Sequence, residues 1–375
     1  MKIPELTRSR TCGLLLMLLM LVSGCATTVP LDAARRDFSN GQLEAADRSL
    51  AERPHDQNAV MNLMERGMIR HLRRDFTNST ADWLEAVRLE KELETHSITK
   101  AGASMVVNDS ALAFRGYPYE RTYLHVYLAK NYLAIGAWED AGVEARSIAY
   151  QLEKLDGFPD DAFSHYLTGF CLELGGDDSN AARQYREVAK LAPDCGIDPA
   201  TGRFPPASTT TNHPPIAGLR GTELVCFLDF DGQYGIIPQS AEIYANGKLL
   251  GTSRTLTTMF QLQSASIDRM ATRHAAKTLS RLAFKLALFI AASSRDENLG
   301  LLTGLLLLAM ENDDQRRWET LPAKLAVARV PCPPDLKEFE VVFKGFSGQT
   351  VSRITVTTPL HQKDRIFVSL CRNYP

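Results

Sequence analysis

Small and aromatic residues recur at fixed spacings through the amino-terminal half of the chain. From Gly169, a glycine follows 7 residues later (Gly176), an alanine 12 later (Ala181), a tyrosine 16 later (Tyr185) and a proline 24 later (Pro193). Such a ladder indicates two antiparallel helices, because small residues let the helices approach and an aromatic side chain fills the groove. Three further ladders follow a similar order: Ala129, Gly136, Ala141 and Ala145; Gly67, Arg74, Ser79, Trp83 and Ala86; Ala34, Gly41, Ala46 and Leu50. The pattern predicts a stack of four helix pairs.

These offsets resemble those of the tetratricopeptide repeat (TPR), whose period is about 34 residues. Ala34 and Gly67 are 33 residues apart, whereas the next steps are 62 and 40, so an insertion of about 28 residues separates the second and third units. Units that bury their faces only against neighbours form a curved solenoid, and its concave side is the default docking surface. An irregular helical bundle is the alternative interpretation.

The insertion, about Ser97 to Pro118, contains residues that break helices and leads into a group of aromatic and charged side chains. A long loop that enters a solenoid helix is a candidate functional element. Five residues form this candidate interaction site: Tyr117, Tyr119, Glu120, Arg121 and His125. A packed Ω-loop with no binding role explains the same residues.

The first residues have the pattern of a secretory signal. The basic residues Lys2, Arg8 and Arg10 precede an apolar run of nine residues from Leu14 to Val22. As a helix, nine residues cannot cross a hydrocarbon core of ~30 Å. We therefore expect residues 1–24 to be a signal peptide and not a transmembrane anchor.

The run ends in Val22-Ser23-Gly24-Cys25, which resembles the lipobox of bacterial lipoproteins. The resemblance implies that the Cys25 thiol receives diacylglycerol before cleavage ahead of it, and acyl chains such as palmitate then anchor the chain stably. Ala26 follows the cysteine, and by resemblance to sorting in Gram-negative bacteria this implies the outer membrane, with the mature protein on the periplasmic side. A buried cysteine in a core helix is the alternative.

Charge and cysteine usage narrow the classes of partner. The 42 basic and 44 acidic residues leave a net charge of −2, so no overall attraction to nucleic acid exists and no nucleic-acid partner is expected. Beyond Cys12 and Cys25, five scattered cysteines remain, an odd number without a C-x-x-C motif. We expect them to be mainly buried hydrophobic residues, although the periplasm permits disulfides.

Proline and threonine mark a domain boundary. Residues 196–219 have the composition of an extended, poorly ordered linker after a helical domain at 25–195. Residues 220–375 then alternate with period two, and Asn246-Gly247 predicts a hairpin with a type I′ turn. Seven strands are predicted, at about 223–230, 242–245, 248–250, 323–330, 338–343, 351–357 and 365–370. The fold class is α+β: a TPR-like solenoid followed by a small antiparallel β-sandwich.

A helical hairpin, at about 264–310, interrupts the predicted strands. Its first helix carries a basic residue at every fourth position, and helical geometry places these on one slowly turning ridge. The basic ridge consists of Arg269, Arg273, Lys277, Arg281 and Lys285. With apolar residues on the other faces, this layout suits a helix at an anionic lipid headgroup boundary. A core helix whose ridge pairs with acids such as Glu311, Asp313 and Asp314 is the alternative. Leu299 to Met310 is too short to span a bilayer as a helix.

Familiar catalytic motifs do not occur. The eight histidines never fall in a metal-binding spacing, and no G-x-S-x-G, phosphate-binding glycine loop or dinucleotide-binding motif is present. Asp229-Phe230-Asp231-Gly232 is similar to the start of a calcium loop, but its twelfth position is Ser240 and a hairpin turn explains it better. No cofactor, metal or catalytic residue is therefore assigned.

Two blocks of sequence resemble a family of uncharacterised Gram-negative outer-membrane lipoproteins with TPR-like helices. The first is Tyr119-Glu120, Leu133 to Gly136 and Ala141 to Arg146. The second consists of Asp314, Arg317, Trp318, Leu321, Pro322 and Arg329. The resemblance implies no known activity.

Together these features predict an outer-membrane-anchored periplasmic lipoprotein that acts as a protein–protein interaction scaffold for envelope proteins. Its membrane contacts would be the lipid on Cys25 and, through the basic ridge, anionic lipid. The alternative function is a cell-wall or polysaccharide-handling enzyme or accessory factor. A deep polar pocket with a perturbed carboxylate or histidine would favour the enzyme.

Overall fold

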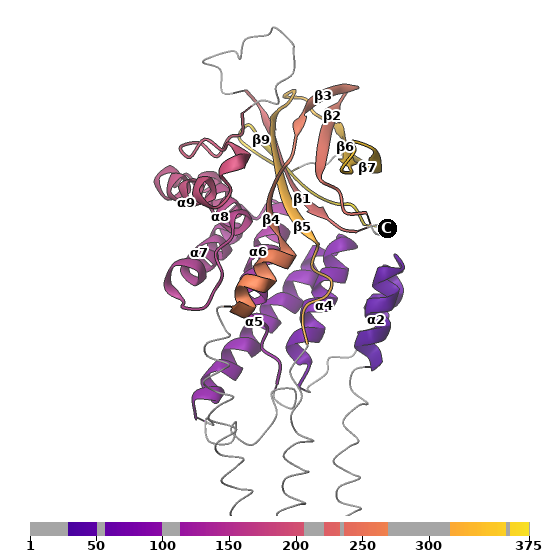
Figure 1. Ribbon diagram of the computed structural model, residues 1–375, viewed down its shortest axis with the longest axis vertical. Coiled ribbons are helices and arrows are strands. Elements are labelled where there is room, and N and C mark those ends of the chain that lie inside the picture. Colours follow the sequence, from indigo (N-terminus) through magenta and orange to yellow (C-terminus); the bar gives the residue numbers. More distant parts are fainter. Residues whose placement is uncertain are drawn as a thin grey trace, which may run out of the picture.

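A computed structural model describes residues 29–50, 57–99, 113–205, 221–232, 236–268, 316–357 and 361–374. Its amino-terminal half consists of four helix pairs, which confirm the predicted stack (Figure 1). The pairs are α2 (Val29–Ser39) with α3 (Leu43–Ser49), α4 (Ala59–Leu72) with α5 (Phe76–Thr99), α6 (Pro118–Ala134) with α7 (Trp138–Lys154), and α8 (Ala162–Leu174) with α9 (Asp178–Leu191).

A three-residue turn joins the two helices of each pair, and its middle residue has a positive φ. Gly41, Gly136 and Gly176 occupy this position with φ of 76°, 73° and 78°. Glycine suits the position because it lacks the Cβ that makes left-handed backbone costly. The α4–α5 turn has Arg74 there instead, at φ 61°.

The small residues of the ladders lie where the helices approach most closely. A Cβ on Gly169 would lie 2.8 Å from Cε1 of Tyr185 and 3.2 Å from the carbonyl oxygen of Ala181. A Cβ on Gly67 would lie 2.3 Å from Nε1 of Trp83. The close approach of two helices that the ladder predicted is therefore confirmed at Gly169 and Ala181.

The carboxy-terminal half forms two packed sheets. One has the strand order β4-β5-β1-β9-β8 and the other β3-β2-β6-β7. The strands are β1 (Glu223–Phe230), β2 (Ser240–Ala245), β3 (Lys248–Thr252), β4 (Arg254–Thr258), β5 (Lys324–Pro331), β6 (Glu338–Lys344), β7 (Thr350–Thr357), β8 (His361–Lys363) and β9 (Ile366–Arg372).

The sheets differ from the sequence prediction in one strand pairing and two extra strands, and they confirm the predicted hairpin turn. β1 and β9 pair in parallel, so the prediction of a purely antiparallel sandwich is wrong at this pair; the other pairs are antiparallel. β4 and β8 were not predicted, because one is short and polar and the other has three residues. The hairpin turn is confirmed as type I′, since Asn246 and Gly247 have φ of 50° and 71°.

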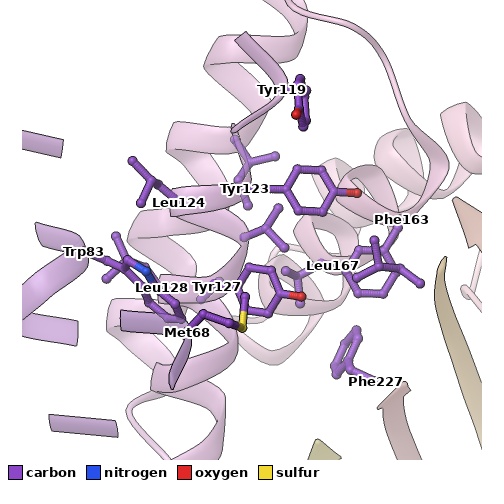
Figure 2. Packing of buried hydrophobic residues seen from close by; sticks show 14 of the residues in the cluster. Met68, Trp83, Tyr119, Tyr123, Leu124, Tyr127, Leu128, Phe163, Leu167 and Phe227 are labelled. Carbon is purple, nitrogen blue, oxygen red and sulfur yellow. The ribbon is translucent and has the colours of Figure 1, made fainter. Parts of the chain in front are cut away.

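The central strand β1 is buried on both faces, and this determines how the two halves meet. One set of its alternate residues packs between the sheets, and the other set, which includes Val225 and Phe227, packs against the helices. The Phe227 ring lies 6.0 Å from that of Phe163 and 5.4 Å from that of Phe170, both in α8. Figure 2 shows Phe227 reaching from the sheet towards Phe163. The halves therefore share a core.

The first helices of the pairs lie between the second helices and the sheet. α6 contacts β9, α8 contacts β4 and β5, and Met68 of α4 lies 3.1 Å from the Arg372 guanidinium. The inner side of the solenoid, predicted to be an open docking surface, is thus covered by the chain's own sheet. The physical reason is that both surfaces are apolar, and each removes the other from water.

The predicted linker is ordered over its first part. Pro193–Cys195 form a 3₁₀ turn, and Cys195 and Ile197 are buried. The ring of Phe204 stacks on Tyr166 at 5.5 Å. Residues 196–205 therefore belong to the folded body, which corrects the prediction for them; residues 206–219 lie outside the described residues.

The helical insertion starts earlier than predicted. Residues 259–268 are helical, and Met259 and Leu262 join the core between helices and sheet. Residues 269–315 lie outside the described residues. Among the helices that the structure describes, none is both long enough and apolar enough to cross a membrane.

Candidate functional site

The predicted interaction site at the start of α6 is mostly an internal contact. Glu120 is fully buried, and its carboxylate accepts hydrogen bonds from the Tyr117 backbone N–H at 2.7 Å and the Tyr119 hydroxyl at 3.1 Å. The first bond is half of a capping box that begins the helix. Burial raises the pKa of Glu120 to about 7. Since Tyr119 is also buried, a surface role for these two residues is wrong.

Arg121 and His125 each pair with acidic residues of the neighbouring helices. His125 Nδ1 lies 2.6 Å from the Glu144 carboxylate, and both residues are buried. Arg121 forms ion pairs with Glu90 and Glu94. Of the five predicted residues, Tyr117 and Arg121 keep intermediate exposure, so the structure does not bring the five together as an open binding surface.

Glu120 also joins the two blocks that carry the family resemblance. Its carboxylate accepts a hydrogen bond from the Trp318 backbone N–H at 2.6 Å, across 198 residues of sequence. The neighbouring Glu65 accepts from the N–H groups of Glu319 and Thr320 at 3.0 and 3.2 Å, and Arg35 pairs with Glu65 at 2.7 Å. Carboxylates of the helices therefore hold the chain segment that precedes β5.

Cys25 and the basic ridge, Arg269, Arg273, Lys277, Arg281 and Lys285, lie outside the described residues.

A buried charge network that sequence reasoning did not predict joins α6 to β1. Lys130 Nζ lies 2.6 and 2.7 Å from the two carboxylate oxygens of Asp229, and the Tyr127 hydroxyl donates to the same carboxylate at 3.0 Å. Burial lowers the pKa of Lys130, and the charge of Asp229 opposes that shift. Arg372 pairs with Asp231 at 2.5 Å. Both aspartates of the segment that is similar to a calcium loop therefore pair with basic side chains of the protein. The described residues include no group of acids, cysteines and histidines that could hold a metal ion.

His71 lies beside this network in a defined tautomer. The Asn131 amide nitrogen donates to Ser79 and Thr80, so its carbonyl oxygen faces His71 Nδ1, 2.6 Å away, and accepts from it. The other ring nitrogen, Nε2, then carries a lone pair. Burial, with the charge of Lys130, lowers the pKa of His71 to about 3. The imidazole is therefore neutral and a poor base at neutral pH.

These groups line a cavity of about 250 Å³ between the α4–α5 turn, the end of α6 and strands β7 to β9. Its polar wall includes His71, Lys130, Asp229 and Arg372, and its apolar wall includes Ile354 and side chains of β9. The site combines paired charges with apolar surface, which suits binding more than proton transfer.

The five described cysteines form no disulfide, and burial makes their thiols unreactive. Cys171, Cys195, Cys226 and Cys371 are buried and Cys332 is half-buried, which confirms the expected hydrophobic role. Burial raises the pKa of Cys371, which lines the cavity, to about 11. Its thiol is therefore protonated at neutral pH and a weak nucleophile.

A second buried network ties α8 to the sheet. The Arg329 guanidinium, 1% exposed, binds Glu173 at 2.6 Å and Glu223 at 2.8 Å. Glu173 also accepts from the Tyr185 hydroxyl at 2.7 Å. Arg329 belongs to the second block of the family resemblance, so that block also supports the contact between helices and sheet.

Comparison with known proteins finds similarity to solved structures at low sequence identity. No protein-family model matches the sequence, and no curated protein matches it. Among solved structures, MamA 41-end from Desulfovibrio magneticus RS-1 is 15% identical with a TM-score of 0.33, covering 46% of this chain and 78% of that one. A MamA RS-1 double mutant is similar at 14% identity and a TM-score of 0.34, with the same coverage. A putative kinesin light chain of Podosopora anserina with TPR-like repeats is similar at 17% identity and 0.32, covering 44% and 74%. The TPR-like repeat itself follows from the four helix pairs and their turns.

Proposed function

We propose that the chain is a periplasmic lipoprotein of the outer membrane, anchored through Cys25, that holds envelope proteins together as a scaffold. The support for the anchor is the sequence pattern of residues 1–25. The support for the scaffold is the stack of helix pairs, an architecture whose extended surfaces serve protein binding.

The arrangement of the described segments agrees with one membrane-proximal end. The last turn of α2 lies at the carboxyl terminus, where the rings of Phe38 and Tyr374 are 4.9 Å apart, so residue 29 lies at the opposite end of that helix (Figure 1). Arg316 bonds Asn58 at the start of α4, at 3.1 Å, and the helix at 259–268 runs away from the sheets (Figure 1). The lipid anchor and the segment with the basic ridge would thus join the body at the same end. This supports a second contact with anionic lipid, worth about 1 kcal/mol per basic residue.

The surface that remains for partners is the outer side of the solenoid, because the sheet covers the inner side. On α7, Val143 and Tyr150 are 48% and 59% exposed and lie seven residues apart, on one face of the helix. These two exposed apolar side chains are the observation that carries the scaffold proposal. The enzyme alternative calls for a group poised for proton transfer, whereas in the cavity Asp229 is held by Lys130 and His71 has a pKa of about 3.

Photo-crosslinking in intact cells tests the scaffold. A photoreactive residue at Tyr150 or Val143 should give discrete protein adducts in envelopes. The matched control is the same residue at Phe346, which is 92% exposed but lies on a turn of the sheets. Equal adducts from Phe346, or none from α7, would contradict the proposed surface.

Fractionation and liposome binding test the membrane contacts separately. Cys25→Ser should abolish processing and recovery in the detergent phase, and unchanged recovery contradicts lipidation. The unacylated chain should sediment with anionic liposomes at low salt and lose that binding at high salt. A variant with Lys277, Arg281 and Lys285 changed to Gln should not sediment. Failure of the wild type to bind at low salt contradicts the lipid contact.

A further inference from the structure

The α4–α5 turn departs from the repeat in a way that packing does not explain. Its middle position requires a positive φ, and three of the four helix pairs supply glycine there. Arg74 adopts φ 61° at this position, where a residue with a Cβ costs about 1–2 kcal/mol. An unfavourable residue of this kind points to a functional role for its side chain.

Arg74 lines the cavity described above. The other two cations there, Lys130 and Arg372, are each paired with an aspartate. Lys130 is paired with Asp229, and Arg372 is paired with Asp231. Among the residues that the structure describes, no acid pairs with Arg74, and its side chain is exposed. The cavity therefore has a positive charge at its edge in excess of its internal ion pairs.

The other walls indicate what kind of anion fits. Leu72 at the end of α4, Ile354 and Val356 in β7, and Leu370 in β9 give the cavity apolar lining. A volume of about 250 Å³ lies below the ~300–1,000 Å³ of pockets for drug-sized ligands. An arginine fork binds a carboxylate through two parallel hydrogen bonds.

We propose that this cavity binds a small organic carboxylate, whose carboxylate pairs with Arg74 and whose short apolar body packs between the α4–α5 turn and β7. The site is separate from the outer face of the solenoid, so the scaffold could fail its test while this site passes, and the reverse.

Calorimetric titration of the whole mature chain, made without its lipid, tests the site with three probes. Hexanoate has both the charge and the apolar body, hexanol lacks the charge, and inorganic phosphate lacks the body. Hexanoate should bind at least tenfold more tightly than either of the others and should raise the melting temperature. Equal binding of hexanol or phosphate, or no binding of hexanoate, overturns the proposal.

Three variants show where the probe binds. Arg74→Gly should weaken hexanoate binding at least tenfold without lowering the melting temperature of the free protein, since glycine suits the backbone there. The control Arg73→Gln removes a neighbouring charge that pairs with Asp47, and it should bind hexanoate as the wild type does.

Ala134→Leu fills space at the end of α6, where Ala134 lines the cavity, and leaves Arg74 intact. It should also weaken hexanoate binding at least tenfold. Binding that survives Ala134→Leu places the probe on the exposed arginine alone, and binding that survives Arg74→Gly removes the carboxylate contact. Either result overturns the proposal.

Discussion

Ion pairs between single residues join the helices to the sheet. Lys130 is 1% exposed and Asp229 2%, so both charges have been taken out of water and each depends on the other. Such a pair is weak evidence for net stability, but removal of one partner leaves an uncompensated buried charge.

Lys130→Met should therefore lower the free energy of unfolding by about 3–5 kcal/mol, measured by urea denaturation. Adding Asp229→Asn should recover most of this loss, because the amide is neutral and still accepts the hydrogen bond from Tyr127. The control Lys190→Met removes a surface lysine that is 68% exposed and should change stability by less than about 0.5 kcal/mol. If the double variant is no more stable than Lys130→Met, the unpaired charge of Asp229 is not the cause of the lost stability.

His165 makes the stability depend on pH. Its Nδ1 faces the Gln184 carbonyl oxygen at 2.5 Å and its Nε2 faces Asp160 at 2.6 Å, so both ring nitrogens donate when the ring is protonated. Burial alone would lower the pKa of His165, but these hydrogen bonds raise it above its ordinary value. The contribution of His165 to the free energy of unfolding is then fully present below its pKa in the unfolded chain. It is lost as pH rises through its pKa in the folded protein.

Between pH 5 and 9, the denaturant midpoint of the wild type should therefore decrease as pH rises through the folded pKa of His165. The variant His165→Gln should lack this decrease. The single variant must be compared with the wild type at each pH, since other groups titrate in the same range. Identical pH profiles for the two proteins would mean that folding does not change the pKa of His165.

At the scale of elements, spacing within a short window predicted structure well. The ladders placed all four helix pairs, because the contacts of a helix pair are local in sequence. Strand pairing was less accessible, since period two shows which residues share a face but not which strand lies alongside. That is why the parallel pairing of β1 with β9, across more than a hundred residues, was missed.

The linker prediction failed for a related reason. The prolines near 193–206 led to the prediction of a linker, although Ile197 is buried and Phe204 stacks on Tyr166 of α8. The buried pair Lys130 and Asp229 had no local signal at all, because the two residues are 99 positions apart.

Two glycines in neighbouring pairs should respond oppositely to substitution. A Cβ on Gly169 would meet Tyr185 at 2.8 Å, so Gly169→Leu should overpack the α8–α9 contact and lower stability by about 1–3 kcal/mol. A Cβ on Gly142, inside α7, would meet only the Arg146 side chain at 3.7 Å, so Gly142→Ala should raise stability by up to about 1 kcal/mol. Thermal unfolding measures both. A loss of stability in both variants would indicate that helix packing at α7 is as tight as at α8.

At the scale of the molecule, the two halves share one hydrophobic core. The sequence contained a sign of this: from Ala162 to Leu172, α8 carries no acidic residue, lysine or arginine, and all of these residues are buried. A helix of that kind needs neighbours on every side. An open solenoid supplies them on one side only, and the sheet supplies the rest.

A chain cut between residues 210 and 211 should therefore stay together. Fragments 26–210 and 211–375, produced in the same cell, should copurify as a 1:1 complex that unfolds in one transition, because the aromatic residues around Phe227 would otherwise face water. Phe163→Glu, which buries an unpaired charge against Phe227, should separate the fragments. Tyr150→Glu, on the outer face of α7, should leave them associated, since Tyr150 is already in contact with water. Separate purification of the wild-type fragments, each with its own unfolding transition, would mean that each half folds independently and that the shared core adds little to stability.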